Sequence, residues 1–384
     1  MKLRLFLLLA VISIALVHTA RVETARRPRY GGTLRAEIGA IVNSLDPAVA
    51  AANPEESAAK ERIGELLYDH RNLDGTFAGV AGSGAFRIAE WEPGKRVTLA
   101  ASETNRGGRA FVDSIEIQMG RSARDRLLDL EAGNTDFAQI PAEQARSASE
   151  HGVRVSASDP DELVAVVFVA GRPIAEDAHA REALARSIDR AAIVSFILQK
   201  EGQPAGGLLP QWSSGTAFLF STASDAAGAK QLWSQIDGSP AIVLGYDSGD
   251  SLEQSVAERI AVNARDAGIS ITAESVTIPG STSPNCDARL MRVRMPSPHP
   301  REALVNLVAM LGPTAALDVA PLPARVSSDQ VLARERAIVS SYRVVPLVWL
   351  PQVYGLSARM RDWNAPAPGE SWPFADVWLE QVSP

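Results

Sequence analysis

A serine between an acid and a glycine is the arrangement in this sequence that comes nearest to a catalytic nucleophile, and it occurs at 246–250 (YDSGD). The segment lacks a second glycine after the serine, and it lies between a predicted strand over 242–246 and a predicted helix over 252–267. A side chain in that place usually caps the helix, because the first backbone N–H groups have no partner inside it. We therefore expect Ser248 or Asp250 to be a cap. The lack of a Gly-x-Ser-x-Gly elbow also argues against a hydrolase.

Metal and phosphate chemistry have equally little support in the sequence. Cys286 is the only cysteine, so neither an internal disulfide nor a multi-cysteine metal site can form. The glycines at 82–84 and 206–207 are too few for a phosphate-binding loop, and no Walker pattern follows them. None of the histidines beyond the N-terminal region has another histidine or an acid at a metal-ligand spacing more often than chance would give; they are His70, His151, His179 and His299. We therefore predict no cofactor, no metal and no enzymatic activity.

The composition is that of a globular protein of two domains, or three. The chain has 384 residues, 46% of them hydrophobic and 22% charged. The net charge of −7 disfavours a broad nucleic-acid surface, because phosphate binding needs clustered positive charge.

The N-terminus indicates export. Lys2 and Arg4 precede an apolar run over 5–17, which is too short for a spanning helix of about 20 residues but fits the apolar region of a signal peptide. We predict a signal peptide over 1–25 and a periplasmic or other extracytoplasmic mature chain. No cysteine follows the run, which excludes a lipoprotein anchor. An uncleaved membrane anchor is the alternative.

Periodicity predicts an α/β protein. The strand, helix and strand between 242 and 276 form a β–α–β unit, which implies parallel strands joined by a crossover helix. The aromatic end of the chain, 372–379, is expected to pack down. The predicted strands are 33–38, 86–88, 97–99, 115–117, 163–169, 242–246, 269–276 and 344–350, and the predicted helices are 57–68, 122–132, 179–199 and 252–267.

Ten short motifs occur along the chain, and their order is informative. They are GGTL (31–34), SLDP (44–47), GSGAFR (82–87), WEPG (91–94), GGR (107–109), REAL (181–184), IDR (188–190), PL (346–347), YG (354–355) and WL (378–379). This order resembles the family 5 extracytoplasmic solute-binding proteins, which are the periplasmic components of peptide and nickel ABC importers.

The sequence also departs from the family pattern. Thirteen residues separate Tyr68 from Gly82, where the family has roughly a hundred that form an extra subdomain of the first lobe, so most of that subdomain is expected to be missing. The segment that usually carries an Asp-Pro motif, whose acid pairs with a peptide's amino terminus, reads MPSPHP over 295–300. The usual Asn before the lobe crossing is replaced over 169–171.

The resemblance implies a two-lobed periplasmic-binding-protein fold, type II-like, with a hinge and a ligand cleft between the lobes. Lobe I would comprise 29–172 and 343–384, and lobe II would comprise 173–342. The implied partners are a peptide or other small-molecule ligand and the ABC permease subunits of the inner membrane. We expect a monomer that does not bind nucleic acid.

Candidate ligand-binding residues follow from their positions beside predicted strands and loops, in the crevice where α/β folds bind ligands. For the aromatic residues the alternative is core packing, and for the acid before Pro47 it is a turn. The candidates are Ser44, Asp46, Ser83, Trp212, Tyr246, Asp247, Trp349 and Tyr354.

Two functions remain open at this stage. The first is an ABC importer's binding component, which delivers a peptide or other small solute to a membrane permease. The second is a degenerate binding-protein fold that acts as a non-transport sensor or interaction protein. The missing subdomain and the missing acid favour the second reading, whereas the resemblance itself favours the first.

Overall fold

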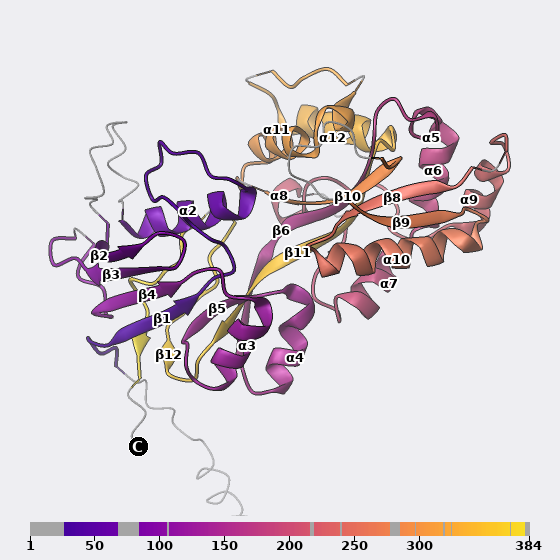
Figure 1. Cartoon of the computed structure of the whole chain (residues 1–384). Coiled ribbons are helices and arrows are strands. Elements are labelled where there is room, and N and C mark those ends of the chain that lie inside the picture. Colours follow the sequence, from indigo (N-terminus) through magenta and orange to yellow (C-terminus); the bar gives the residue numbers. More distant parts are fainter. Residues whose placement is uncertain are drawn as a thin grey trace, which may run out of the picture.

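A computed structural model describes residues 27–67, 84–105, 107–215, 219–238, 240–276, 285–295, 297–317, 319–323, 325–368 and 370–380. Its described part is built on an 11-stranded mixed sheet in the order β2-β3-β4-β1-β5-β11-β6-β10-β8-β9, with β7 paired to β11. Two halves lie along this sheet (Figure 1). The predicted signal peptide falls outside the described residues, as do the thirteen residues between Tyr68 and Gly82, where we expect most of the extra subdomain to be missing.

The first half contains β1 (Thr33–Glu37), which pairs in parallel with β4 (Ser114–Gln118) and β5 (Phe137–Ile140). An antiparallel edge follows, made of β2 (Phe86–Glu92) and β3 (Arg96–Ala101). Helix α2 (Pro54–Leu67) covers one face of this half and α3 (Ala123–Glu131) the other. Trp372 and Phe374 are buried in the first-half core, as the aromatic end of the chain predicted.

The second half contains the predicted β–α–β unit. It consists of β8 (Ile242–Asp247), α10 (Ser251–Asp266) and β9 (Ile271–Val276), and the two strands are parallel. Asp250 caps α10, because its Oδ1 accepts hydrogen bonds from the N–H groups of Leu252 and Glu253. The cap confirms the structural reading of the YDSGD loop.

Two long antiparallel strands run through both halves. They are β6 (Arg154–Phe168) and β11 (Val344–Leu356), and each extends well beyond its predicted range. Register shifts near Pro346 and Pro351 let β11 carry two prolines in the middle of a sheet, since an irregular ladder does not need every N–H. The crossing strands join the two halves into one sheet.

The predicted helix over 179–199 is wrong as a single helix. Helix α6 (Ala178–Ser187) stops at Ile188, which is extended and buried, and Asp189 then caps the short α7 (Arg190–Ala192). A short π-helix, η3 (Ile193–Ile197), follows. The Asp189 carboxylate accepts a hydrogen bond from the Ala192 N–H at 2.9 Å. An acid inside the apolar-periodic stretch therefore caps a second, separate helix.

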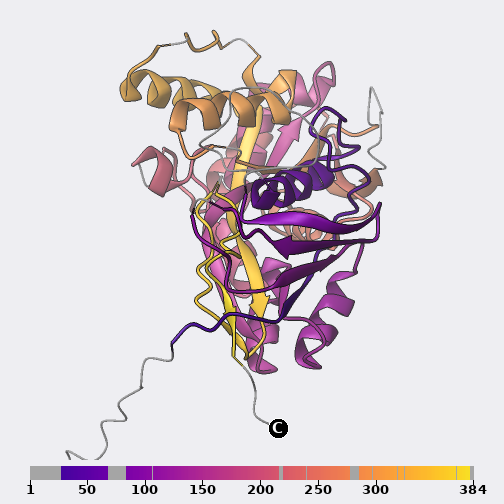
Figure 2. The same ribbon diagram turned by 90° about the vertical axis from the view of Figure 1, so that its left-hand side faces the viewer.

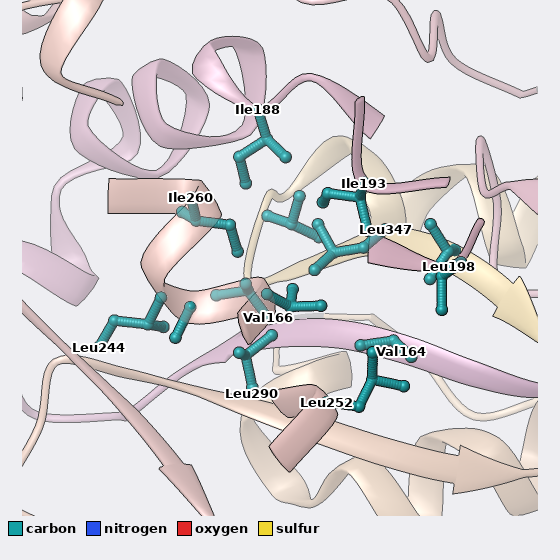
Figure 3. Close-up of a cluster of buried hydrophobic side chains, with 14 of the residues drawn as sticks. Val164, Val166, Ile188, Ile193, Leu198, Leu244, Leu252, Ile260, Leu290 and Leu347 are labelled. Atoms are coloured by element: carbon teal, nitrogen blue, oxygen red, sulfur yellow. The ribbon is translucent and has the colours of Figure 1, made fainter. Parts of the chain in front are cut away.

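Three buried apolar clusters form the cores of the described residues. Figure 3 shows the one that joins α10 and η3 to the sheet, with Ile188, Ile260 and Leu290 pointing toward one another. Viewed from the first half, the orange helices α11 and α12 lie above the indigo helix α2 (Figure 2). In the described chain no helix combines the length and apolarity that a membrane crossing requires. The remaining elements are η2 (Ala142–Gln144), α4 (Ala145–Glu150), α5 (Pro173–Glu176), β7 (Gln203–Pro204), α8 (Gln211–Ser214), α9 (Ala226–Trp233), β10 (Ala288–Arg294), α11 (Pro300–Leu311), η4 (Pro313–Ala316), α12 (Ser328–Ser340), β12 (Met360–Arg361) and β13 (Trp378–Leu379).

Candidate ligand site between the two halves

A polar cluster lies where the crossing strands pass from one half to the other. Gln352 on β11 donates its Nε2–H to Asp161 Oδ1 on β6 at 3.1 Å, and both side chains are buried. Arg62 on α2 donates to the hydroxyl of Tyr354 on β11 at 2.8 Å. Arg294, at the end of β10, acts electrostatically on Asp161. Arg294 pairs in register with Glu162, so it acts on Asp161 from the opposite face, at the end of the strand. We call these five residues the crossing-strand cluster: Arg62, Asp161, Arg294, Gln352 and Tyr354.

Asp161 is the acid of this cluster, and its surroundings are unusual. Its exposed fraction is 2%, and burial raises the pKa of its carboxyl to about 6. The positive charges of Arg294 and Arg62 lower that pKa, but burial outweighs them. A buried carboxyl with a raised pKa, on a strand that crosses between two halves of a protein, is a candidate for ligand contact.

The two arginines of the cluster differ in their hydrogen bonding. Arg62 donates to Tyr354 and stands over the Trp372 ring at 5.5 Å, so its position is fixed by the first half. Arg294 comes from the second half, and its Nε is buried without a hydrogen-bond partner among the described residues. A buried donor without a partner is costly, so a ligand oxygen that accepted from Arg294 would relieve that cost.

Three predicted aromatic residues lie along this same side of the crossing strands. Tyr354 is a member of the cluster. Trp212, just after the glycine loop, donates its Nε1–H to the carbonyl of Pro160 at 2.9 Å, next to Asp161. Trp349 is buried in the apolar cluster beneath α11 and α12, and its Nε1 has no hydrogen-bond partner among the described residues. Trp212 is in α8 and the other two are on β11, so no local pattern in the sequence records this grouping.

The other predicted residues lie elsewhere. Tyr246 packs against the core on the α10 side of the sheet, and Asp247 Oδ1 accepts from the Gly249 N–H at 2.9 Å. Ser44 and Asp46 form a turn, in which Ser44 Oγ accepts from the Asp46 N–H at 3.2 Å. Ser83 lies outside the described residues.

A second charged cluster lies on the opposite face of β6. Arg292 donates to Glu162 at 2.8 Å and to Asp250 at 2.7 Å, and it acts on the nearby Glu143 and Glu253. Burial raises the pKa of Glu253 to about 7 and also raises the pKa of Glu143. These ion pairs join β6, β10 and the start of α10 beneath the crossing strands. No group of three or more potential metal ligands occurs in the described part of the chain.

The model of the bacterial extracellular solute-binding proteins, family 5 Middle, matches residues 47–307. The chain belongs to this family. Curated relatives include the oligopeptide-binding protein AppA of Bacillus subtilis, 26% identical over 125 residues, which are 32% of this chain and 23% of the relative. The probable D,D-dipeptide-binding periplasmic protein DdpA of Escherichia coli is 23% identical over 203 residues, 51% of this chain and 39% of the relative. The chain thus aligns with less than half the length of these relatives.

Solved structures show the same fold. The ABC transporter substrate-binding protein CtaP of Listeria monocytogenes superposes with a TM-score of 0.73 at 13% identity, covering 91% of this chain and 100% of that one. The periplasmic binding protein DppA of Helicobacter pylori, solved with the peptide STSA, gives a TM-score of 0.71 at 13% identity, covering 92% and 99%. The predicted family and the predicted two-lobed α/β architecture are confirmed.

Proposed function

We propose that this chain is the extracytoplasmic solute-binding component of an ABC-type importer. It binds a small solute between two lobes and delivers it to a membrane permease without chemically changing the solute. Family membership supports the role, and AppA and DdpA are named as peptide-binding proteins. The lobes are 29–172 with 343–384, and 173–342.

The crossing-strand cluster is the observation that carries this proposal. It contains a buried carboxyl and two arginines drawn from both halves, and one of these arginines has an unused donor. Closure of two lobes around a solute at such a place would bring the solute against these polar groups. Trp212, which is half-buried, lies beside it, whereas Tyr354 is fully buried in the first-half core and holds Arg62 through its hydroxyl.

The solute is anchored by groups other than a free amino terminus. Among the described residues of 295–300, Ser297 donates its Oγ–H to Glu302 at 3.1 Å, so this segment offers no acid of its own. The acids that could substitute are already engaged: Asp287 accepts from the Val243 N–H at 2.8 Å, Asp247 from the Gly249 N–H, and Asp161 from Gln352 at 3.1 Å. Burial also favours the neutral form of Asp161, which pairs poorly with an ammonium group. Arg294 instead offers a donor, which fits a carbonyl or carboxylate oxygen of the solute.

Thermal shift on the exported protein tests the proposal. A solute at a hundred times its Kd stabilises the protein by about 2.7 kcal/mol, which raises Tm by roughly 5–10 °C for lobes of this size. Solutes that co-purify are identified by mass spectrometry and then titrated individually. Arg294→Gln should abolish the shift, and Arg289→Gln on the same strand should preserve it.

Two results would count against this assignment. A full shift in Arg294→Gln would place the solute elsewhere. A shift with free di- to pentapeptides that acetylation of their amino termini removes would show that an acid does bind the amino terminus. An isolated gene without neighbouring permease and ATPase genes would favour the alternative, a sensor or interaction protein that kept the fold.

A further inference from the structure

The second half contains a cavity of about 380 Å³, and no residue of the crossing-strand cluster lines it. It lies between the end of α6, the loop before α9, the end of α12 and the start of β11. Its charged or hydroxyl-bearing walls include Arg186, Arg190, Asp225 and Tyr342. The cavity therefore lies in the second half of the sheet, where the start of β11 packs against α6 and α12, away from the crossing-strand cluster.

Arg190 is the buried cation of this cavity. Its exposed fraction is 6%, and its Nε and Nη1 donate to the carbonyls of Pro346 at 2.8 Å and Ala185 at 3.4 Å. Its Nη2 makes no hydrogen bond among the described residues, and no carboxylate there pairs with it. Burial lowers the pKa of Arg190 to about 10, still well above neutral, so the guanidinium stays charged. A buried charge without a counter-ion is costly.

The other charges around the cavity are already paired. Arg186 donates to Glu182 at 2.6 Å and to Asp225 at 3.1 Å. Asp225 also accepts from the Gly228 N–H at 2.8 Å, which caps α9. Because Glu182 and Asp225 both pair with Arg186, Arg190 has no counter-ion on the cavity wall among the described residues.

The rest of the wall is largely apolar. Val344 and Val345 are buried at the start of β11, Val339 closes the α12 side, and Phe220 lies opposite in the loop before α9. Ser221 and Ala223 are exposed parts of the lining. A pocket of this volume with one charged anchor fits a small molecule with an apolar body and a single acid group.

We propose that this cavity is a second ligand site, which binds a small organic monocarboxylate. The carboxylate accepts hydrogen bonds from the Arg190 guanidinium, and the apolar body packs against Phe220 and Val344. The site goes beyond the solute delivery proposed above, because it lies away from the crossing-strand cluster and has its own anchor.

Isothermal titration of the full exported protein with benzoate tests this site, with benzamide as the neutral analogue. We expect benzoate to bind with a Kd of about 1 mM or tighter, and benzamide and inorganic phosphate to bind at least about tenfold more weakly. Ala223→Trp fills the exposed rim and should weaken benzoate by about tenfold or more. Ala227→Trp, exposed on α9 and outside the lining, is the matched control and should bind like the wild type.

Arg190→Gln removes the anchor and should also abolish binding; if it fails to fold, Ala223→Trp alone decides. Arg294→Gln separates the two proposals, because it alters the site between the lobes and should leave benzoate binding unchanged. The cavity assignment is wrong if the wild type shows no benzoate heat, if benzamide or phosphate binds equally well, or if Ala223→Trp retains full affinity. It is also wrong if Arg294→Gln, rather than Ala223→Trp, abolishes binding.

Discussion

Replacing Asp161 with Asn should make the protein more stable at alkaline pH. Burial raises the pKa of Asp161 from an ordinary 3.8 to about 6, so the folded protein holds this proton more tightly than the unfolded chain does. The carboxyl therefore destabilises the fold progressively as pH rises from about 4 to 6, and the full penalty applies above that range. A shift of about two units corresponds to roughly 3 kcal/mol, at about 1.4 kcal/mol per unit.

Asp161→Asn keeps the shape and a hydrogen bond to Gln352 but cannot ionise. We expect the variant to exceed the wild type in unfolding free energy by about 2–3 kcal/mol at pH 8 and by no more than about 1 kcal/mol at pH 4.5. Urea melts by circular dichroism at several pH values measure this difference directly. Because the two proteins share every other titrating group, their difference isolates Asp161.

The control is Asp159→Asn, which lies exposed on the same strand and should match the wild type at every pH. A pH-independent difference between Asp161→Asn and the wild type would refute the reasoning. So would a variant that is less stable than the wild type at pH 8. Either result would mean that Arg62 and Arg294 hold Asp161 ionised and that the pair, rather than the burial, dominates.

Three further predictions concern packing and strain, each measured by denaturant melts. Leu184→Ala should cost about 2–5 kcal/mol, because Leu184 is fully buried in the second-half core; a loss below about 0.5 kcal/mol would place it outside the core. Gly202→Ala should cost more than about 1 kcal/mol, because φ is +98° and an added Cβ would lie 2.7 Å from the Trp349 carbonyl oxygen; Gly215→Ala, with open space around it, should cost less. Arg359→Ala should cost about 3–5 kcal/mol, because it leaves the fully buried Asp136 without its two-pronged partner; unchanged stability would show that the other donors to Asp136 suffice.

The sequence by itself determined the class of fold, the family and the local elements. Alternation and helical spacing place β1, β8 and α10 near their observed bounds, and Asp250 caps α10 as predicted. These signals are legible because strand period, helix period and capping involve residues close together in the chain. The same local logic failed over 179–199, where burial of Ile188 and capping by Asp189 outweighed helical propensity.

Only the tertiary structure decided which polar residues form a site. Asp161 and Gln352 are 191 positions apart, and Arg62 and Tyr354 are 292 apart. The meeting of Asp161 and Gln352 depends on the register of β6 against β11, which shifts near Pro346 and Pro351. Because side chains alternate between the faces of a strand, Asp161 faces the crossing-strand cluster and Glu162 the opposite face, where it pairs with Arg292. A shift of one residue would exchange those roles, and no local pattern in the sequence records that register.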